Sequence, residues 1–322
     1  MSDADRLRVV VLDDYQGVAA ALGEWSSIAG EVEVDSIREH IADPARLCAR
    51  IGSARVVVAM RERTLLSDQV LADLSALELI VTTGPSNVMI DVAAANARGI
   101  DVCGTGGYLT PTSELTWALI LALMRNVPAE DRSLREGGWQ HTLGRELAGR
   151  TLGIIGLGRV GTLVAKVGLA FDMNVIAWSP NLNSDQAAAV GVRAVEREEL
   201  FTEADVVTVH MVLSERSRGL VGGSDLARMK PTAILVNTSR GPIIDEKALV
   251  DVLERRAIGG AALDVFDREP LPKDHPLRGL ENTVLTPHLG YVSDGLYDLF
   301  FREIVEDIAA WRRGELIRVV EP

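Results

Sequence analysis

Three motifs in the second half of the chain place side chains that can do chemistry at the ends of apolar, strand-like runs. Arg240 stands in Asn-Thr-Ser-Arg-Gly, and His288 follows Pro287 in Thr-Pro-His-Leu-Gly. Between them, Ala-Leu-Asp-Val-Phe-Asp-Arg-Glu-Pro places Asp264 at the end of a run and Glu269 in the loop beyond. The carboxyl ends of parallel strands lie at the sheet edge where ligands bind. We therefore expect these groups to act together at one site.

One arginine, one carboxylate and one imidazole suit the reduction of a 2-keto acid. Arg240 offers a rigid, permanently charged fork that would bind the substrate carboxylate and polarise the carbonyl. His288 would supply the proton, and Glu269 would hold the ring and favour its charged form. The competing interpretations are a surface salt bridge for Arg240 and a satisfied loop histidine for His288. No comparable setting surrounds the other histidines, which are His40, His141, His210 and His275.

A glycine-rich turn earlier in the chain predicts a dinucleotide site, and a nicotinamide cofactor would bring the hydride. In Gly-Leu-Gly-Arg-Val-Gly, Gly156 would make a tight turn after an apolar strand. Gly158 would let the backbone reach the pyrophosphate, and Gly161 would let the next helix pack on the strand. Amides near Arg159 and Val160 would face the phosphates at the positive end of the helix dipole. The alternative is a glycine-rich turn that binds nothing.

The end of the next predicted strand bears on the choice between NAD and NADP. An acidic residue about twenty positions beyond the turn usually holds the adenosine ribose. Here Ser179 stands at that place, and Asn181 is near it. The missing carboxylate removes the repulsion of a 2′-phosphate, yet no arginine or lysine follows closely to bind one. The sequence favours NAD and does not exclude NADP.

Composition restricts the partners and the compartment. Among 322 residues, 33 Lys and Arg stand against 46 Asp and Glu, a net charge of −13 that repels nucleic acid and anionic membranes. The sequence shows no signal peptide and no apolar run long enough to span a bilayer, so we expect a cytoplasmic protein. Cys48 and Cys103 have apolar neighbours and are expected to be free thiols. No metal site is expected.

Short apolar runs alternate with segments of helical periodicity, which is typical of parallel sheets covered on both faces. Strands are predicted at residues 8–12, 32–36, 54–59, 79–82, 101–102, 151–155, 174–178, 206–210, 233–237, 260–263 and 284–285. Helices are predicted at 67–74, 92–98, 113–125 and 299–311, and 317–320 has strand character. The helix at 113–125 is apolar on nearly all sides and is expected to cross between domains. Residues 127–150 are expected to be turn-rich.

The four motifs occur in the order and spacing of the D-isomer-specific 2-hydroxyacid dehydrogenases, and the chain resembles that family over nearly its whole length. The resemblance implies an α/β protein of two flavodoxin/Rossmann-like parallel-sheet domains with the active-site cleft between them. Residues 1–105 and 293–322 would form a discontinuous substrate (catalytic) domain, and residues 106–292 the dinucleotide-binding domain. Two chains would form a homodimer through the latter.

The same resemblance assigns roles to particular residues. Arg240, Glu269 and His288 would catalyse the NAD(P)-dependent interconversion of a small anionic 2-keto acid and a D-2-hydroxy acid. Further residues would line the cofactor, namely His210, Thr238, Ser239, Asp264 and Gly290.

A first-domain loop of the family gives backbone amides to the substrate carboxylate. The matching stretch here contains Gly84, Pro85, Ser86 and Asn87. Pro85 has no amide to donate, and the usual second glycine is replaced. Gly84, Ser86 and Asn87 are therefore the predicted substrate-binding residues of this loop. Arg61 and Arg63 follow a predicted strand and would either favour an acidic substrate or form solvated surface.

Two other functions use related scaffolds. Formate or phosphite dehydrogenation is compatible with the same motifs. Some relatives of the fold are dinucleotide-sensing corepressors, which bind partner peptides. The compact ends of this chain argue against a corepressor.

Overall fold

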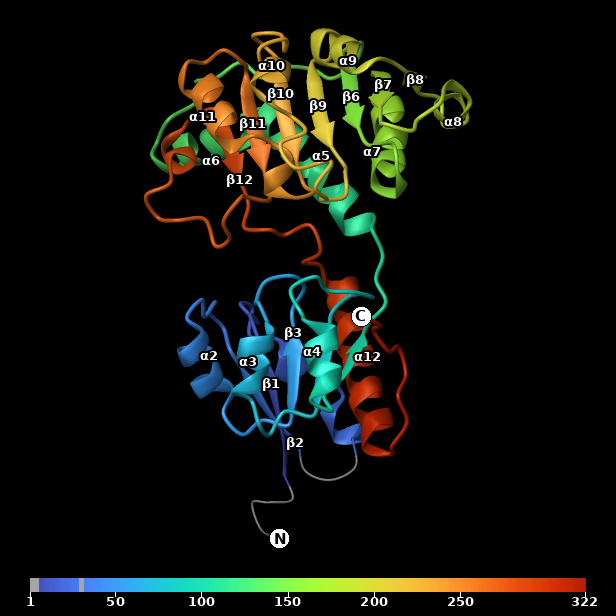
Figure 1. The fold of residues 1–322 in the computed structure, drawn as a ribbon. Coiled ribbons are helices and arrows are strands. Elements are labelled where there is room, and N and C mark those ends of the chain that lie inside the picture. The colour runs from blue at the N-terminus through green and yellow to red at the C-terminus, as the bar shows by residue number, and fades with distance from the viewer. Residues whose placement is uncertain (1–5, 29–31) are drawn as a thin grey trace. The chain divides into compact units, whose positions relative to one another are not determined.

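The computed structural model describes residues 6–28 and 32–322 and divides into two compact units (Figure 1). Unit 1 takes the described residues up to Tyr108 together with Ser293–Pro322, and unit 2 is Leu109–Val292. The observed division therefore falls after residue 108 and after residue 292, beside the predicted positions after 105 and after 292. Each unit is built around a parallel sheet of its own, as the sequence predicted.

The sheet of unit 1 has the strand order β2-β1-β3-β4-β5, and all of its pairings are parallel. The order reverses between β1 and β3, because the chain first adds β2 on one side and then β3 to β5 on the other. The strands are β1 (Leu7–Val11), β2 (Val32–Ser36), β3 (Val56–Ala59), β4 (Leu79–Thr82) and β5 (Asp101–Gly104). The central strands β3 and β4 are buried on both faces, which explains their continuous apolar sequences.

Helices cover both faces of the unit 1 sheet. Neighbouring helices α2, α3 and α4 lie on one face, and α1 and α12 pack together on the other. The helical segments are α1 (Ala19–Leu22), η2 (Trp25–Ser27), α2 (Pro44–Ile51), α3 (Asp68–Ala72), α4 (Val92–Ala97) and α12 (Asp294–Arg312). Ser67 caps α3 by accepting a hydrogen bond from the Val70 amide.

The sheet of unit 2 has the order β12-β11-β10-β9-β6-β7-β8 and is also parallel throughout. Its order reverses between β6 and β9, which is the point where such sheets bind ligands. The strands are β6 (Thr151–Ile155), β7 (Asn174–Trp178), β8 (Arg193–Ala194), β9 (Val206–Val209), β10 (Ile234–Asn237), β11 (Gly260–Leu263) and β12 (Thr283–Leu285).

Two layers of helices enclose this second sheet. Helices α5 and α7 pack side by side against one face, and α9, α10 and α11 form a row on the other. The helical segments are α5 (Thr110–Met124), α6 (Val127–Arg135), α7 (Arg159–Ala170), α8 (Ser184–Ala188), α9 (Arg197–Glu203), α10 (Gly223–Leu226), η3 (Gly241–Ile243), α11 (Glu246–Glu254) and η4 (Pro276–Gly279).

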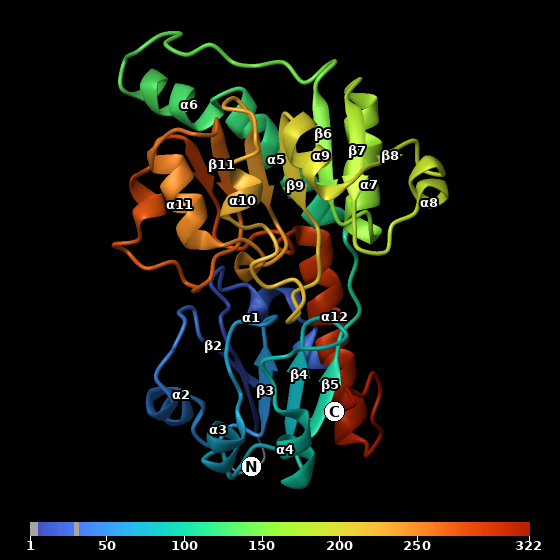
Figure 2. The same cartoon turned by 45° about the horizontal axis from the view of Figure 1, so that its top comes forward.

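Three local expectations are corrected by the structure. Helix α5 lies wholly within unit 2, so the chain crosses from unit 1 in the residues before it. The segment 127–150 begins with a helix, α6, and only its later part is irregular, as the long trace after α6 in Figure 2 shows. The expected strand 317–320 is reduced to one bridge, between Val319 and Cys103. Arg318 has a φ of +52°, which breaks the extended backbone that a longer strand requires.

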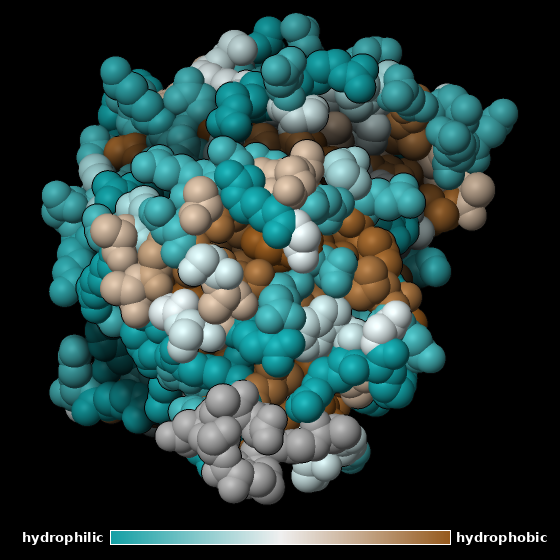
Figure 3. All heavy atoms as spheres, turned by 60° about the horizontal axis from the view of Figure 1, so that its bottom comes forward, coloured by the Kyte–Doolittle hydropathy of each residue, from teal (hydrophilic) through white to brown (hydrophobic). Residues whose placement is uncertain are grey.

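Cys48 and Cys103 are both free, and burial raises the pKa of the Cys103 thiol to about 12. In residues 6–28 and 32–322, no helix combines the length and apolar character that crossing a bilayer requires. The face seen in Figure 3 carries hydrophilic residues over much of its area, with smaller hydrophobic areas between them.

Candidate active site

The glycine turn after β6 has the geometry that a dinucleotide requires. Gly156 has a φ of +98°, and a Cβ there would collide with the carbonyl oxygen of His210. A Cβ on Gly161 would collide with the Gly156 carbonyl, so α7 approaches the turn this closely only because Gly161 lacks a side chain. Gly158 differs, because no atom lies within 4 Å of its ideal Cβ position. Space for a ligand therefore exists at the middle glycine.

Helix α7 begins at this turn and leaves its first amides available to an anion. Gly158 is its N-cap residue, and no side chain caps the helix. Arg159 and Val160 are the first two helical residues, so their N–H groups have no partner within the helix. A pyrophosphate suits this position because the N-terminal end of a twelve-residue helix favours negative charge.

Ser179, at the end of β7, fastens the glycine turn. Its hydroxyl oxygen accepts a hydrogen bond from the Leu157 amide at 3.0 Å, and the Gly156 amide donates to the Trp178 carbonyl at 2.9 Å. Asn181 lies beyond it and is exposed. The residue at the usual place of the ribose-binding acid is therefore neutral and already bound to the turn.

Glu269 and His288 form a close pair at the carboxyl edge of the sheet. The Glu269 Oε2 atom lies 2.6 Å from His288 Nδ1, and its Oε1 atom accepts a hydrogen bond from the Phe266 amide at 3.0 Å. The ring of Tyr291 meets the imidazole edge-on at 5.8 Å between centroids. His288 has a φ of +56°, an uncommon conformation of the kind that proteins retain at functional sites.

Asp264 holds the loop that carries His288. Its carboxylate is buried and accepts hydrogen bonds from Thr286 Oγ1 at 2.6 Å, from the Leu289 amide at 2.7 Å and from the Gly290 amide at 2.9 Å. The His288 amide in turn donates to the Asp264 carbonyl at 2.8 Å. Burial raises the pKa of the Asp264 carboxyl, and these hydrogen bonds oppose that rise. Asp264 and Gly290 were predicted to line the cofactor, and both lie directly beside the His288 loop.

Arg240 follows β10, the neighbour of β11 in the sheet. Asn237 braces this turn, since its side-chain amide donates to the Arg240 carbonyl at 2.9 Å and its oxygen accepts from the Ser239 amide at 3.0 Å. The Arg240 Nη1 atom donates to the Ser239 carbonyl at 2.8 Å. Gly241 packs so closely on the peptide after Phe266 that a Cβ would collide with it. The loop of Arg240 and the loop of Glu269 are thereby held together.

Two further predicted cofactor residues directly follow neighbouring strands. His210 follows β9, and its Nε2 atom lies 3.0 Å from Thr208 Oγ1. Burial lowers the pKa of His210 to about 3, so it remains uncharged at neutral pH. Thr238, after β10, pairs its hydroxyl with that of Thr116 on α5 at 2.8 Å. Both residues are at the carboxyl edge that also carries the glycine turn.

The predicted substrate loop lies in unit 1, after β4. Gly84 has a φ of +95°, and a Cβ there would collide with the guanidinium of Arg61, which donates to the Thr83 carbonyl at 3.1 Å. The Asn87 side chain bonds to the Arg61 carbonyl at 2.7 Å. Within the described part of the chain, the backbone amides of Ser86 and Asn87 have no hydrogen-bond partner. Two neighbouring amides therefore remain available to a carboxylate.

His275 was assigned no role from the sequence, but it lies further along the loop that carries Glu269. Its Nε2 atom lies 3.0 Å from Glu246 Oε1 on α11, a residue 29 positions earlier in the chain. No local pattern in the sequence links residues that far apart on different elements.

Among the described residues, no group of three or more His, Cys, Asp or Glu side chains could hold a metal ion.

Comparisons with known proteins agree with this geometry. The model of the D-isomer specific 2-hydroxyacid dehydrogenase NAD-binding domain matches residues 117–290, more than half of the chain. A glyoxylate reductase from Korarchaeum cryptofilum is 42% identical over 234 residues, which are 70% of this chain and 70% of that protein. A D-3-phosphoglycerate dehydrogenase from Archaeoglobus fulgidus is 38% identical over 81% of this chain, but over only 50% of its own length.

A solved structure of phosphoglycerate oxidoreductase from Vibrio cholerae is also similar. It superposes with a TM-score of 0.91 at 35% identity, covering 96% of this chain and 99% of that one. The two parallel sheets, the glycine turn and the matched domain define an NAD(P)-dependent oxidoreductase. Within that class, the chain belongs to the D-isomer-specific 2-hydroxyacid dehydrogenase family.

Proposed function

We propose that the protein interconverts a small 2-keto acid and the corresponding D-2-hydroxy acid, with His288 as the acid/base residue. The observation that carries the proposal is the Glu269–His288 pair at 2.6 Å, at the same sheet edge as the glycine turn. Unit 2 would be the dinucleotide-binding domain and unit 1 the substrate domain.

In this proposal each polar group has one task. A bound NAD(P)H supplies the hydride to the carbonyl carbon. His288 donates a proton to the carbonyl oxygen, so keto acid, reduced cofactor and one proton yield hydroxy acid and oxidised cofactor. Glu269 accepts the Nδ1–H of the ring, which leaves Nε2 to face the substrate. Arg240 binds the substrate carboxylate and polarises the carbonyl.

The proposal is tested by a panel of 2-keto acids assayed for loss of reduced-nicotinamide absorbance, with NADH and NADPH in parallel. We expect saturable oxidation of the cofactor with at least one small keto acid and a D-configured product. The neutral Ser179 leaves both cofactors in the test. NADH is expected to be the better one because no arginine or lysine closely follows Ser179 in the sequence to bind a 2′-phosphate. Saturable cofactor binding without turnover of any acid, formate or phosphite would instead indicate a binding protein.

We also propose that two chains form a homodimer through the segment 127–143 of unit 2. This segment exposes Val127 (53%), Leu134 (57%), Trp139 (77%) and Leu143 (92%). Large apolar side chains gathered in one exposed stretch are typical of an interaction surface. A symmetric pair of chains would bury them against the same segment of the partner, as in most homodimers.

Light scattering coupled to gel filtration tests this assembly. The wild-type protein is expected at about twice the chain mass of 34.7 kDa. Replacing Trp139 and Leu143 together by glutamate should shift it to the monomer, because two charges would be buried in an apolar contact. Leu316→Glu, an exposed leucine of unit 1, is the matched control and should remain dimeric. A monomeric wild type, or a dimeric double variant, contradicts the proposal.

A further inference from the structure

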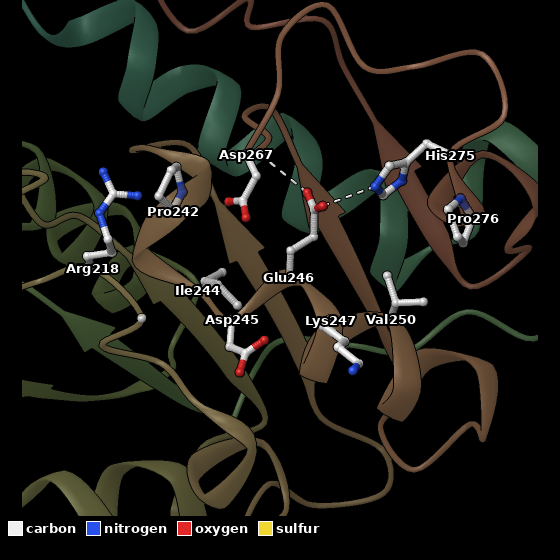
Figure 4. Close-up of a pocket in the computed structure, with 11 residues that line it drawn as sticks. Arg218, Pro242, Ile244, Asp245, Glu246, Lys247, Val250, Asp267, His275 and Pro276 are labelled. Carbon is white, nitrogen blue, oxygen red and sulfur yellow. Dashed lines mark hydrogen bonds and ion pairs between the residues drawn. The ribbon is translucent and has the colours of Figure 1, made fainter.

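One carboxylate, that of Glu246, bonds to two points of the loop that carries Glu269. Glu246 is the first residue of α11. Its Oε2 atom accepts a hydrogen bond from the backbone amide of Asp267 at 3.3 Å, and its Oε1 atom lies 3.0 Å from Nε2 of His275. Figure 4 shows Glu246 between these two partners, with both bonds drawn. Because Glu269 lies between residues 267 and 275, this carboxylate closes the loop that contains it.

The bond between His275 and Glu246 has a fixed direction. The Nδ1 atom of His275 accepts a hydrogen bond from the Leu277 amide at 3.3 Å, which also caps η4. An acceptor nitrogen carries no proton, so the ring proton is on Nε2 and is donated to Glu246. His275 is therefore held at both ring nitrogens. Its position fixes the C-terminal end of the loop that contains Glu269.

The other end of the loop is connected directly to the acid–base pair. Glu246 holds the amide of Asp267 on one side of the peptide after Phe266, and Gly241 packs closely against that same peptide. The Phe266 amide donates to Glu269 Oε1, and Glu269 Oε2 reaches His288. The peptide that donates to Glu269 is thus the one directly before the peptide that Glu246 holds, and Phe266 joins the two.

Glu246 and His275 lie at the surface rather than in the apolar core. They line a cavity of about 590 Å³ together with Arg218, Pro242 and Lys247 (Figure 4). Their side chains are 23% and 16% exposed, so both are accessible to substitution without opening a void in the core. A displacement of about 1 Å at a catalytic group is enough to lower a rate about 100-fold.

We propose that Glu246 and His275 are positioning residues that fix the loop of Glu269 and, through it, the Glu269–His288 pair. The proposal rests on the proposed function, in which that pair is the acid/base of the reaction. Neither residue is assigned a contact with the substrate in that function. Their effect is on the angle and distance at which Glu269 meets the imidazole.

Three substitutions remove the two bonds in steps. Glu246→Ala removes both, and Glu246→Gln keeps an acceptor for only one of the two donors. His275→Asn keeps a side-chain cap for η4 but is too short to reach Glu246. We expect kcat for keto-acid reduction to fall about 10- to 100-fold in Glu246→Ala, with smaller losses in the other two and cofactor affinity unchanged. Lys247→Gln, a change of charge on the same cavity wall, should leave kcat within about 2-fold.

A double-mutant cycle distinguishes positioning from a general loss of structure. If Glu246 acts through Glu269, Glu246→Ala should cost little once Glu269→Gln is present, because the group it positions has already been lost. If the fold losses in kcat of the two single variants multiply in the double variant, the proposal is overturned, because Glu246 and Glu269 then act independently. An unchanged kcat in Glu246→Ala would also overturn it.

A second measurement is independent of turnover. In protein labelled with ¹⁵N at histidine, the Nδ1–H proton of His288, assigned by its loss in His288→Asn, should resonate far downfield because of the short bond to Glu269. Glu246→Ala should move this signal upfield, whereas Lys247→Gln should not. A signal that stays in place rejects the positioning role even if no substrate has been found. Failure of the keto-acid panel alone, with the signal shifted as expected, rejects the proposed function and leaves the positioning role supported.

Discussion

Replacing His288 by asparagine is expected to lower kcat/KM for keto-acid reduction about 1,000-fold, which is about 4 kcal/mol of transition-state stabilisation. Asparagine suits the test because, like histidine, it tolerates the left-handed backbone conformation, here a φ of +56°. It cannot deliver a proton to the carbonyl oxygen. The hydride step must then wait for a proton from water, so the loss should appear in kcat.

The reverse reaction extends the same prediction. Hydroxy-acid oxidation should also slow in His288→Asn, because it needs a proton acceptor where reduction needs a proton donor. Cofactor affinity, measured by nicotinamide fluorescence, is the control and should change by less than about 2-fold, because the glycine turn lies on other strands. A variant with wild-type kcat would eliminate His288 as the acid/base residue.

The parts of the site that could be predicted from sequence are those with a local cause. Gly156 stands directly after a buried strand and has the positive φ that the spacing of the glycines implied. Glu269 and His288 are 19 residues apart, yet both follow strands, β11 and β12, that pair in parallel. Strand ends that share an edge can be brought together by reasoning about sheet topology alone. Their catalytic roles stay predictions until they are measured.

Other features depend on tertiary contacts with no local signature. The bond between Glu246 and His275 joins residues 29 positions apart, one on a helix and one in a loop. Helix α6 was missed because its few apolar side chains, which include Val127 and Leu134, do not recur every three or four residues as in a core-facing helix. Ser179 directly follows β7, where the sequence predicted that it stands in place of a ribose-binding acid. Its hydrogen bond to the Leu157 amide could not be inferred, because it depends on how the turn folds back toward β7.

Arg240→Ala is the second substitution expected to have a large effect, a loss of about 1,000-fold in kcat/KM for the keto acid. The guanidinium would serve two purposes, because it binds the carboxylate in the ground state and stabilises the charge that develops on the carbonyl oxygen. KM should therefore rise and kcat fall together, unlike the effect of His288→Asn. Arg240→Lys should recover only part of the loss, since a single ammonium cannot reproduce a two-pronged contact.

Chemical rescue separates this role from a structural one. Low concentrations of guanidinium chloride should partly restore the rate of Arg240→Ala, because the free cation can occupy the space left by the side chain, whereas sodium chloride should not. The turn itself should survive the substitution, since Asn237 braces it through the backbone of Arg240 and Ser239 rather than through the guanidinium. Arg228→Ala removes an exposed arginine paired with Glu198 in the same unit and should leave the kinetics unchanged. Equal activity in Arg240→Ala and Arg228→Ala would refute the assigned role, because it would mean that Arg240 contributes no more than a surface charge.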